Sequence, residues 1–110
     1  MSVYITNSQP HFDYSEAMRF GELVEVSTRL YSFHPGRKET NDALIAEMAK
    51  TLDNYDPERD FILTSGSAIS NGICFAALAL RGIRKVQVLS YVANDRTYVP
   101  NIVDFGAIDE

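Results

Sequence analysis

The stretch FILTSGSAISNGICFAALALRG, residues 61–82, constrains the fold more than any other part of the chain. Its first four residues favour a strand, and an apolar run without alternation is typical of a strand covered on both faces. The turn Ser65-Gly66-Ser67 follows, and residues 68–81 predict a helix that ends at Gly82. A buried strand that leads through a short turn into a helix is the building unit of a parallel α/β sheet.

The other segments predict a continued alternation of strands and helices. We expect strands at residues 3–6, 22–27, 85–92 and 97–103, and helices at residues 15–20 and 41–53. The second of these helices is predicted by apolar side chains at helical spacing: Leu44, Ile45, Met48, Ala49 and Leu52. Ser15 and Thr40 suit the N-caps of the two helices, and residues 93–96 suit a hairpin turn. Pro100 has no N–H group, so the last strand is expected at a sheet edge.

This order of elements predicts one α/β domain over residues 1–110. We expect a small Rossmann-like sheet, mainly parallel in the order β-α-β-α-β-α-β, with a C-terminal antiparallel hairpin strand at its edge. A chain of 110 residues is long enough for one domain with one core. In its order of elements and its Ser65-Gly66-Ser67 turn, the chain resembles small Rossmann-like nucleotide-binding domains. That resemblance implies a nucleotide-like ligand, but a fold does not establish a function.

Charge and composition exclude several classes of protein. Fifteen acidic and ten basic side chains give a net charge of −5, so a phosphate backbone would be repelled and we expect no nucleic-acid partner. The single cysteine, Cys74, excludes an intrachain disulfide. The two histidines lack the spacing of metal ligands, so we predict no metal site. No apolar run is long enough to span a bilayer, and no leader pattern opens the chain. We therefore expect a soluble, cytoplasmic protein with no membrane partner.

The predicted ligand site lies where the carboxyl ends of the strands meet the N-terminus of a helix. Ligands of open α/β sheets bind at that edge, and helix N-termini offer free N–H groups with a partial positive charge. We therefore expect a small anionic, nucleotide-like ligand, with no cofactor indicated. The expected ligand-binding residues are Asn7 and Ser8 after the first strand, Arg29 after the second, and Ser65, Gly66 and Ser67 after the third.

A structural interpretation competes with this one. Ser67 or Ser70 would then only cap the helix, and the local basic group Arg29, Arg37 and Lys38 would be solvated loop charges. The turn matches neither the GxGxxG fingerprint nor a P-loop, because no lysine follows the glycine. The sequence leaves the choice between a ligand site and a helix cap open.

No catalytic constellation is recognisable in the sequence. There is no GxSxG elbow, so we assign no catalytic residue and leave enzymatic activity open. If the protein is an enzyme, Ser65, Asp13 and His11 are the first residues to test. Cys74 lies in an apolar helix, where an inert thiol is expected.

Two functional alternatives stand beside ligand binding. One is a non-enzymatic acidic adaptor or inhibitor, whose tyrosines would include interface anchors. The other is a hydrolase or transferase that acts on a nucleotide-like substrate at the same sheet edge. Under each alternative we expect a homo-oligomer. The helix at residues 68–81 is apolar on all sides, and apolar residues also gather near the edge strand.

Overall fold

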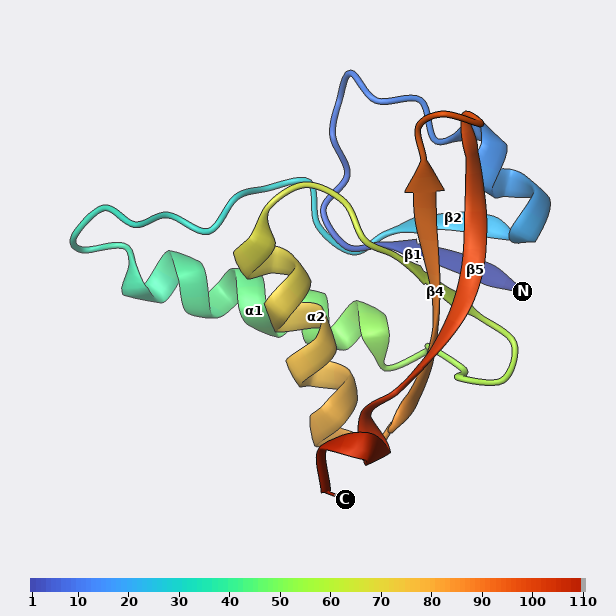
Figure 1. Ribbon diagram of the computed structural model, residues 1–110. Helices are drawn as coiled ribbons and strands as arrows, with labels where there is room; N and C mark the ends of the chain where they lie inside the picture. The colour runs from blue at the N-terminus through green and yellow to red at the C-terminus, as the bar shows by residue number, and fades with distance from the viewer. Residues whose placement is uncertain (110) are drawn as a thin grey trace.

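The computed structural model describes residues 1–109 and contains a five-stranded mixed sheet (Figure 1). The strands are β1 (Ser2–Ile5), β2 (Glu22–Glu25), β3 (Phe61–Leu63), β4 (Lys85–Val92) and β5 (Thr97–Asp104). Their order across the sheet is β2-β1-β3-β4-β5. The first four strands are parallel, and β5 is antiparallel to β4. The predicted α/β sheet, mainly parallel with an antiparallel C-terminal hairpin, is therefore confirmed.

The two faces of the sheet are covered by different helices. α1 (Lys38–Leu52) and α2 (Ala68–Leu80) pack on one face, and the 3-10 helix η1 (Ser15–Phe20) packs on the other. A second 3-10 helix, η2 (Phe105–Asp109), follows β5. Successive residues of a strand point to opposite faces. In β1, Tyr4 therefore joins the core below the two α-helices, whereas Val3 and Ile5 join the core below η1.

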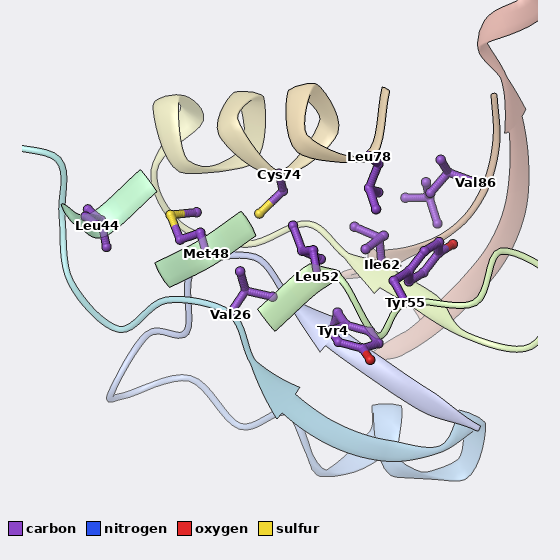
Figure 2. Packing of buried hydrophobic residues seen from close by; sticks show 11 residues of the cluster. Tyr4, Val26, Leu44, Met48, Leu52, Tyr55, Ile62, Cys74, Leu78 and Val86 are labelled. Atoms are coloured by element: carbon purple, nitrogen blue, oxygen red, sulfur yellow. The ribbon is translucent and has the colours of Figure 1, made fainter. Parts of the chain in front are cut away.

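The main core lies between the sheet and the two α-helices (Figure 2). The apolar stripe predicted for α1 faces this core, with Leu44, Met48 and Leu52 buried. From α2, Cys74 and Leu78 point between α1 and the sheet. Because residues four apart lie on the same side of a helix, these positions form one continuous buried row on each helix. The packing of the two helices fixes where the N-terminus of α2 meets the sheet.

The start of α1 differs from the prediction. The helix begins at Lys38 with Arg37 as its N-cap, and not after Thr40. Lys38 and Glu39 are good helix formers, and an acidic side chain in the first turn favours the helix dipole. These two effects extend the helix upstream, although Arg37 supplies no side-chain cap.

The predicted helix at residues 15–20 is a 3-10 helix. Its N-cap is Tyr14, without a side-chain cap hydrogen bond, so the prediction of Ser15 as the cap is wrong. The carboxylate of Asp13 instead accepts a hydrogen bond from the N–H of Ser15 at 2.9 Å. Gly21 ends this helix as predicted. Short connecting helices are frequently 3-10, although six residues is longer than most 3-10 runs.

The C-terminal hairpin follows the predicted pattern. Its turn lies at residues 93–96, where the N–H of Asp95 donates to the carbonyl of Val92 at 3.2 Å. β5 is an edge strand, so the prediction for Pro100 is confirmed. β5 ends at Asp104, and η2, which the sequence did not predict, begins at the next residue.

α2 is not covered on all sides within the chain. Its inner side is buried and packs against α1 and the sheet. Its outer side exposes Ile69, Gly72, Ala76, Ala79 and Leu80. A neighbouring helix therefore covers only part of this apolar helix. Within residues 1–109, no helix combines the length and the apolar character that a membrane crossing requires.

Candidate ligand-binding site

Thr6 joins the carboxyl ends of the neighbouring strands β1 and β3. Its N–H donates to the carbonyl of Leu63 at 3.1 Å, and its hydroxyl oxygen accepts from the N–H of Ser65 at 3.0 Å. The Thr6 hydroxyl lies 2.6 Å from Oδ1 of Asn71, and Nδ2 of Asn71 donates to the carbonyls of Ser65 and Ser67. Thr6 is fully buried. The turn after β3 is therefore held from β1 on one side and from α2 on the other.

Asn7 ties the ends of three strands together. It is buried, and its Oδ1 accepts hydrogen bonds from the N–H of Ser67 and from Nε2 of Gln9, each at 3.0 Å. Its Nδ2 donates to the carbonyl of Arg29 at 3.2 Å. These bonds connect the segment after β1 to the segments after β3 and β2. In this structure the polar atoms of Asn7 are therefore engaged by the protein.

Gly66 lies where the backbone and two side chains crowd together. Its φ of +72° is in the left-handed region that favours glycine. A Cβ atom at this position would lie 2.3 Å from Oδ1 of Asn7 and 2.5 Å from Nε2 of Gln9. Because glycine has no side chain, other groups can approach its backbone closely. In the structure, the groups that approach it are Asn7 and Gln9.

Ser65 contacts a tyrosine that the sequence did not single out. The hydroxyl of Tyr14 lies 2.7 Å from Oγ of Ser65, and it accepts a hydrogen bond from the N–H of Gln9 at 2.9 Å. Because the Tyr14 oxygen accepts from Gln9, its proton is free to point at Ser65. The loop after β1 is thus fixed against the turn after β3.

The N-terminus of α2 combines a cap with free amides. Ser67 is the N-cap, and its side chain accepts from the N–H of Ser70 at 3.5 Å, so Ser67 caps the helix as the structural interpretation predicts. The N–H groups of Gly66, Ala68 and Ile69 have no hydrogen-bond partner within residues 1–109, and all three residues are exposed. Free N–H groups at a helix N-terminus are suited to bind an anion. The cap therefore leaves donors available at this edge.

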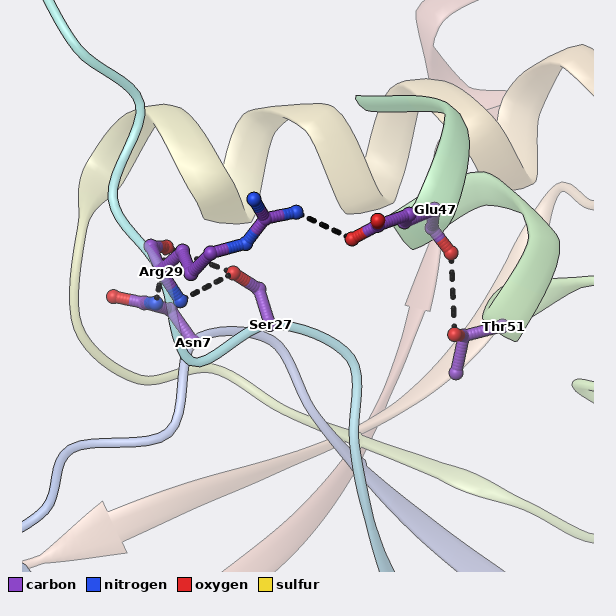
Figure 3. Close-up of polar contacts among 5 residues, drawn as sticks. All are labelled: Asn7, Ser27, Arg29, Glu47 and Thr51. Carbon is purple, nitrogen blue, oxygen red and sulfur yellow. Dashed lines mark hydrogen bonds and ion pairs between the residues drawn. The ribbon is translucent and has the colours of Figure 1, made fainter. Parts of the chain in front are cut away.

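Arg29 contributes its main chain to this region, while its guanidinium points away (Figure 3). The carbonyl of Arg29 accepts from Nδ2 of Asn7 and from the hydroxyl of Ser27. Its side chain forms an ion pair with Glu47 on α1. The expected positive charge beside Ser65 is therefore turned towards α1 and compensated there.

Ser8 lies on the side of β2. Its N–H donates to the carbonyl of Ser27 at 2.8 Å, and its hydroxyl donates to Glu25 at 3.3 Å. Of the six predicted residues, the structure thus brings Asn7, Ser65 and Ser67 into one hydrogen-bonded cluster, and Gly66 packs closely against Asn7. The side chains of Ser8 and Arg29 lie outside it.

Half-exposed aromatic rings stand beside the cluster. The ring of Phe12 lies 4.9 Å from that of Tyr14 and 5.6 Å from that of Tyr91, measured between centroids. Phe12 and Tyr91 are each 43% exposed. Sequence reasoning missed this group. The position of Tyr91 near the carboxyl end of a predicted strand was one available signal, but nothing in the sequence places Phe12 against it.

Ser65, Asp13 and His11, the first residues to test for catalysis, share no hydrogen bond within the described residues. Within the described residues, the hydroxyl of Ser65 contacts Tyr14, and neither a histidine nor a carboxylate contacts it. Hydrogen bonds from Ser15 lower the pKa of the Asp13 carboxyl. Burial raises the pKa of the Cys74 thiol to about 12, which keeps it protonated. No cluster of three or more metal-ligating side chains occurs in residues 1–109.

Two surface pockets lie at the other end of the strands, near the residues that precede β4. One, of about 500 Å³, is lined by residues that include Pro57, Ile83 and Ile102, and the other, of about 480 Å³, lies between α2 and η2. Both are near the start of β4, whereas the Ser65 turn is at the carboxyl ends of the strands. These two pockets therefore lie away from the predicted site, which is a surface of exposed amides beside a hydrogen-bonded cluster.

Comparisons with known proteins give one result. A family model described as "Phage Pam3 gp32-like protein" matches residues 1–105. No curated protein and no solved structure matches the chain.

Proposed function

The chain belongs to the Phage Pam3 gp32-like protein family, and we propose that it binds a small anionic, nucleotide-like ligand beside Ser65, Gly66 and Ser67. One observation carries the proposal. The turn lies between β1 and β3, from which the chain leaves towards opposite sides of the sheet. In open α/β sheets, ligands bind outside the carboxyl ends of the strands at such a switch point.

The Rossmann-like character of the sheet is part of this proposal. The order β2-β1-β3-β4 supports it, because doubly wound sheets with a switch point between β1 and β3 have this order; the antiparallel β5 is added at one edge. The short η1 stands where such folds carry a full helix. The two long helices lie on the other face, and α2 presents its N-terminus at the switch point.

The exposed N–H groups define the anionic part of the ligand. A phosphate or carboxylate oxygen at Gly66, Ala68 and Ile69 would meet three donors that make no bond within the described chain. Binding there displaces neither the bond from Ser67 to Asn7 nor the cap of α2. Because the guanidinium of Arg29 is paired with Glu47, the amides and the helix dipole supply the attraction.

The aromatic rings define the rest of the ligand. Phe12 and Tyr91 are half-exposed and are linked to Ser65 through Tyr14. A flat heteroaromatic ring stacks favourably on such side chains. A phosphate group on the amides and a base against the aromatic rings together describe a nucleotide-like ligand.

The test is ligand-dependent thermal stabilisation measured with a panel of nucleotides and with inorganic phosphate. A ligand at one hundred times its Kd stabilises the folded state by about 2.7 kcal/mol, which such a scan detects. The decisive variant is Ala68→Glu, which places a carboxylate beside the free amides at a position where an acidic residue favours the helix. The variant should stay folded and lose the stabilisation by phosphate-bearing ligands.

Ala46→Glu is the matched control. Ala46 is exposed in the middle of α1, so the same change of charge occurs away from the turn. This control should respond to ligand as the unmodified protein does. No stabilisation by any member of the panel, or equal stabilisation of the Ala68→Glu variant, would contradict the proposal.

A second candidate function, protein binding, is favoured by the segment between β2 and α1. The buried Asn41 holds Ser32 with two hydrogen bonds: its Oδ1 accepts from the N–H at 2.9 Å, and its Nδ2 donates to the carbonyl at 2.8 Å. On either side of this clamp, Leu30 is 67% exposed and Phe33 is 81% exposed. Large apolar side chains on a fixed loop are suited to anchor a partner.

This candidate is tested by affinity capture from source-cell lysate. The unmodified protein should retain a partner that the double variant Leu30→Ser, Phe33→Ser loses. The single variant Met18→Ser, which changes another exposed apolar residue on η1, should retain the same partner. Identical captures by all three proteins would count against this segment as the interface.

A further inference from the structure

β5 offers one edge of the sheet to solvent, and its hydrogen-bonding groups divide into two sets. The N–H of Phe105 donates to the carbonyl of Arg84 at 2.7 Å, which continues the β4–β5 ladder by one pair. In an antiparallel pair, hydrogen-bonded and non-hydrogen-bonded residues alternate. Counting back from Phe105, Val103 and Asn101 therefore point their N–H and C=O groups to β4. Ile102 and Pro100 point theirs to the open edge.

Around Thr97 and Tyr98, the edge of β5 is covered by a side chain from η1. Nη2 of Arg19, on η1, donates to the carbonyl of Tyr98 at 3.0 Å and to the hydroxyl of Thr97 at 2.8 Å. The bond to Tyr98 agrees with the outward direction of its carbonyl. Pro100 has no N–H to offer at the next outward position. Below Tyr98, the carbonyl of Pro100 and both backbone groups of Ile102 and Asp104 remain open.

The open part carries exposed apolar side chains. Ile102 is 65% exposed and Val99 is 45% exposed, and the two lie on opposite faces of the strand. The segment from residue 97 to residue 103 has no charged side chain. Burying Ile102 against another chain would remove its exposed apolar surface from water, which favours association.

We propose that residues 100–104 of β5 form a dimer interface, where Ile102 pairs with Ile102 of a second copy around a two-fold axis. In this register the N–H of each Ile102 donates to the carbonyl of Ile102 in the other copy, so the pair shares two hydrogen bonds. The N–H of each Asp104 donates to the carbonyl of Pro100 in the other copy. Pro100 lies opposite Asp104 of the other copy, so its missing N–H removes no hydrogen bond of Ile102. The two β-sheets become one continuous sheet.

Charge selects both this edge and this register. The chain carries a net charge of −5, so two copies repel each other over most of their surfaces. The other edge strand, β2, exposes Glu22 and Glu25 and would bring acidic side chains of the two copies together. An axis at Val103 would place the two Asp104 side chains on diagonal positions of one face. The axis at Ile102 moves them apart, because each then lies across from Pro100.

The experiment is light scattering coupled to size-exclusion chromatography over a range of micromolar concentrations. The unmodified protein should have twice the mass of the 12.3 kDa chain. Ile102→Glu and Ile102→Lys each place like charges across the axis, and each variant should have the mass of one chain. Leu80→Glu is the matched control, because it adds the same charge at an exposed apolar residue on α2, away from β5, and it should stay dimeric.

A mixture of the two variants is a test that unfolded variants could not pass. An equal mixture of the Ile102→Glu and Ile102→Lys variants should form a dimer that contains one chain of each, because opposite charges then face each other. The interface proposal is overturned if the unmodified protein keeps the mass of one chain. It is also overturned if the Ile102→Glu variant stays dimeric, or if the mixture stays monomeric.

Discussion

Oδ1 of Asn7 accepts a hydrogen bond from the backbone N–H of Ser67 at 3.0 Å, across sixty positions of the chain. Asn7 follows β1, and Ser67 is the N-cap of α2. The bond therefore sets the position of the α2 N-terminus relative to the sheet. It also occupies an amide that a helix N-terminus would otherwise present to a ligand, so the bond contributes to the architecture and limits the binding surface at the same time.

Replacing Asn7 tests how much this bond stabilises the fold. In an Asn7→Ala variant, the partly buried N–H of Ser67 loses its partner, and the carbonyl of Arg29 keeps only the hydroxyl of Ser27. A buried group left without a partner costs about 1–3 kcal/mol, so we expect the free energy of unfolding to fall by about that amount. Urea denaturation measures it. Asn54→Ala, at an exposed asparagine, is the control and should stay within about 0.5 kcal/mol of the unmodified protein.

Gly66 allows steric crowding to be separated from backbone strain. Gly66 and Gly36 both have positive φ, +72° and +80°, so alanine is strained at either position. Only at Gly66 does an added Cβ collide, because it would lie 2.3 Å from Oδ1 of Asn7, whereas nothing lies within 4 Å at Gly36. We expect Gly36→Ala to destabilise by about 1 kcal/mol and Gly66→Ala by clearly more. Equal losses in urea denaturation would show that Asn7 yields and that the turn is not held by it.

The sequence predicted the architecture because its signals were local. The strand and helix of residues 61–80 follow from apolar patterning, and Pro100 indicates an edge because proline lacks an N–H whatever its neighbours are. Helix starts were less certain. Arg37 gives no cap signal, yet Lys38 and Glu39 extend α1 upstream of Thr40.

The sequence predicted only those residues of the cluster that directly follow a strand. Ser65, Gly66 and Ser67 follow β3 directly, and Asn7 follows β1, so the rule for strand ends brings them together. Tyr14 and Asn71 were missed because their contacts require the pairing of β1 with β3. The direction of the Arg29 side chain was missed because it is decided by Glu47, on the helix that follows in the chain.

Alkaline pH should weaken the fold through three buried groups. Burial raises the pKa of the Cys74 thiol from 9.0 to about 12, and it likewise raises the pKa of the Tyr55 and Tyr98 hydroxyls from 10.0 to about 12. The unfolded chain therefore releases these protons first as the pH rises. The stabilisation is fully present below pH 9.0 and is lost progressively up to about pH 12.

Urea denaturation as a function of pH measures this effect. The free energy of unfolding should fall between pH 9.0 and about 12, and the fall should be shallower in a Cys74→Ala variant, which lacks one of the titrating groups. That variant also loses buried volume, so the comparison concerns the slope with pH and not the absolute stability. If the free energy of unfolding of the unmodified protein does not change over this pH range, the raised pKa values of these buried groups are wrong.

Pro100 and Asn101 are adjacent on β5 but direct their backbone groups to opposite sides, so a pair of substitutions tests the assignment. Pro100→Thr restores an N–H on the open edge, opposite Asp104 of the second copy in the proposed dimer. The two-fold axis makes this two new hydrogen bonds of about 1 kcal/mol each, which corresponds to a roughly thirtyfold lower Kd of dimerisation. Sedimentation equilibrium measures this Kd, and the stability of the single chain should change little.

Asn101→Pro makes the opposite change. Asn101 pairs with Val88, and its N–H points into the ladder with β4. Proline at this position removes a ladder hydrogen bond and should destabilise the single chain by about 3 kcal/mol or more, as measured by urea denaturation. Comparable destabilisation by Pro100→Thr, or tolerance of Asn101→Pro, would mean that the inward and outward sets on β5 are reversed. The open edge would then present Val103 and Asn101, and a two-fold pairing of Ile102 through its own N–H and C=O could not form.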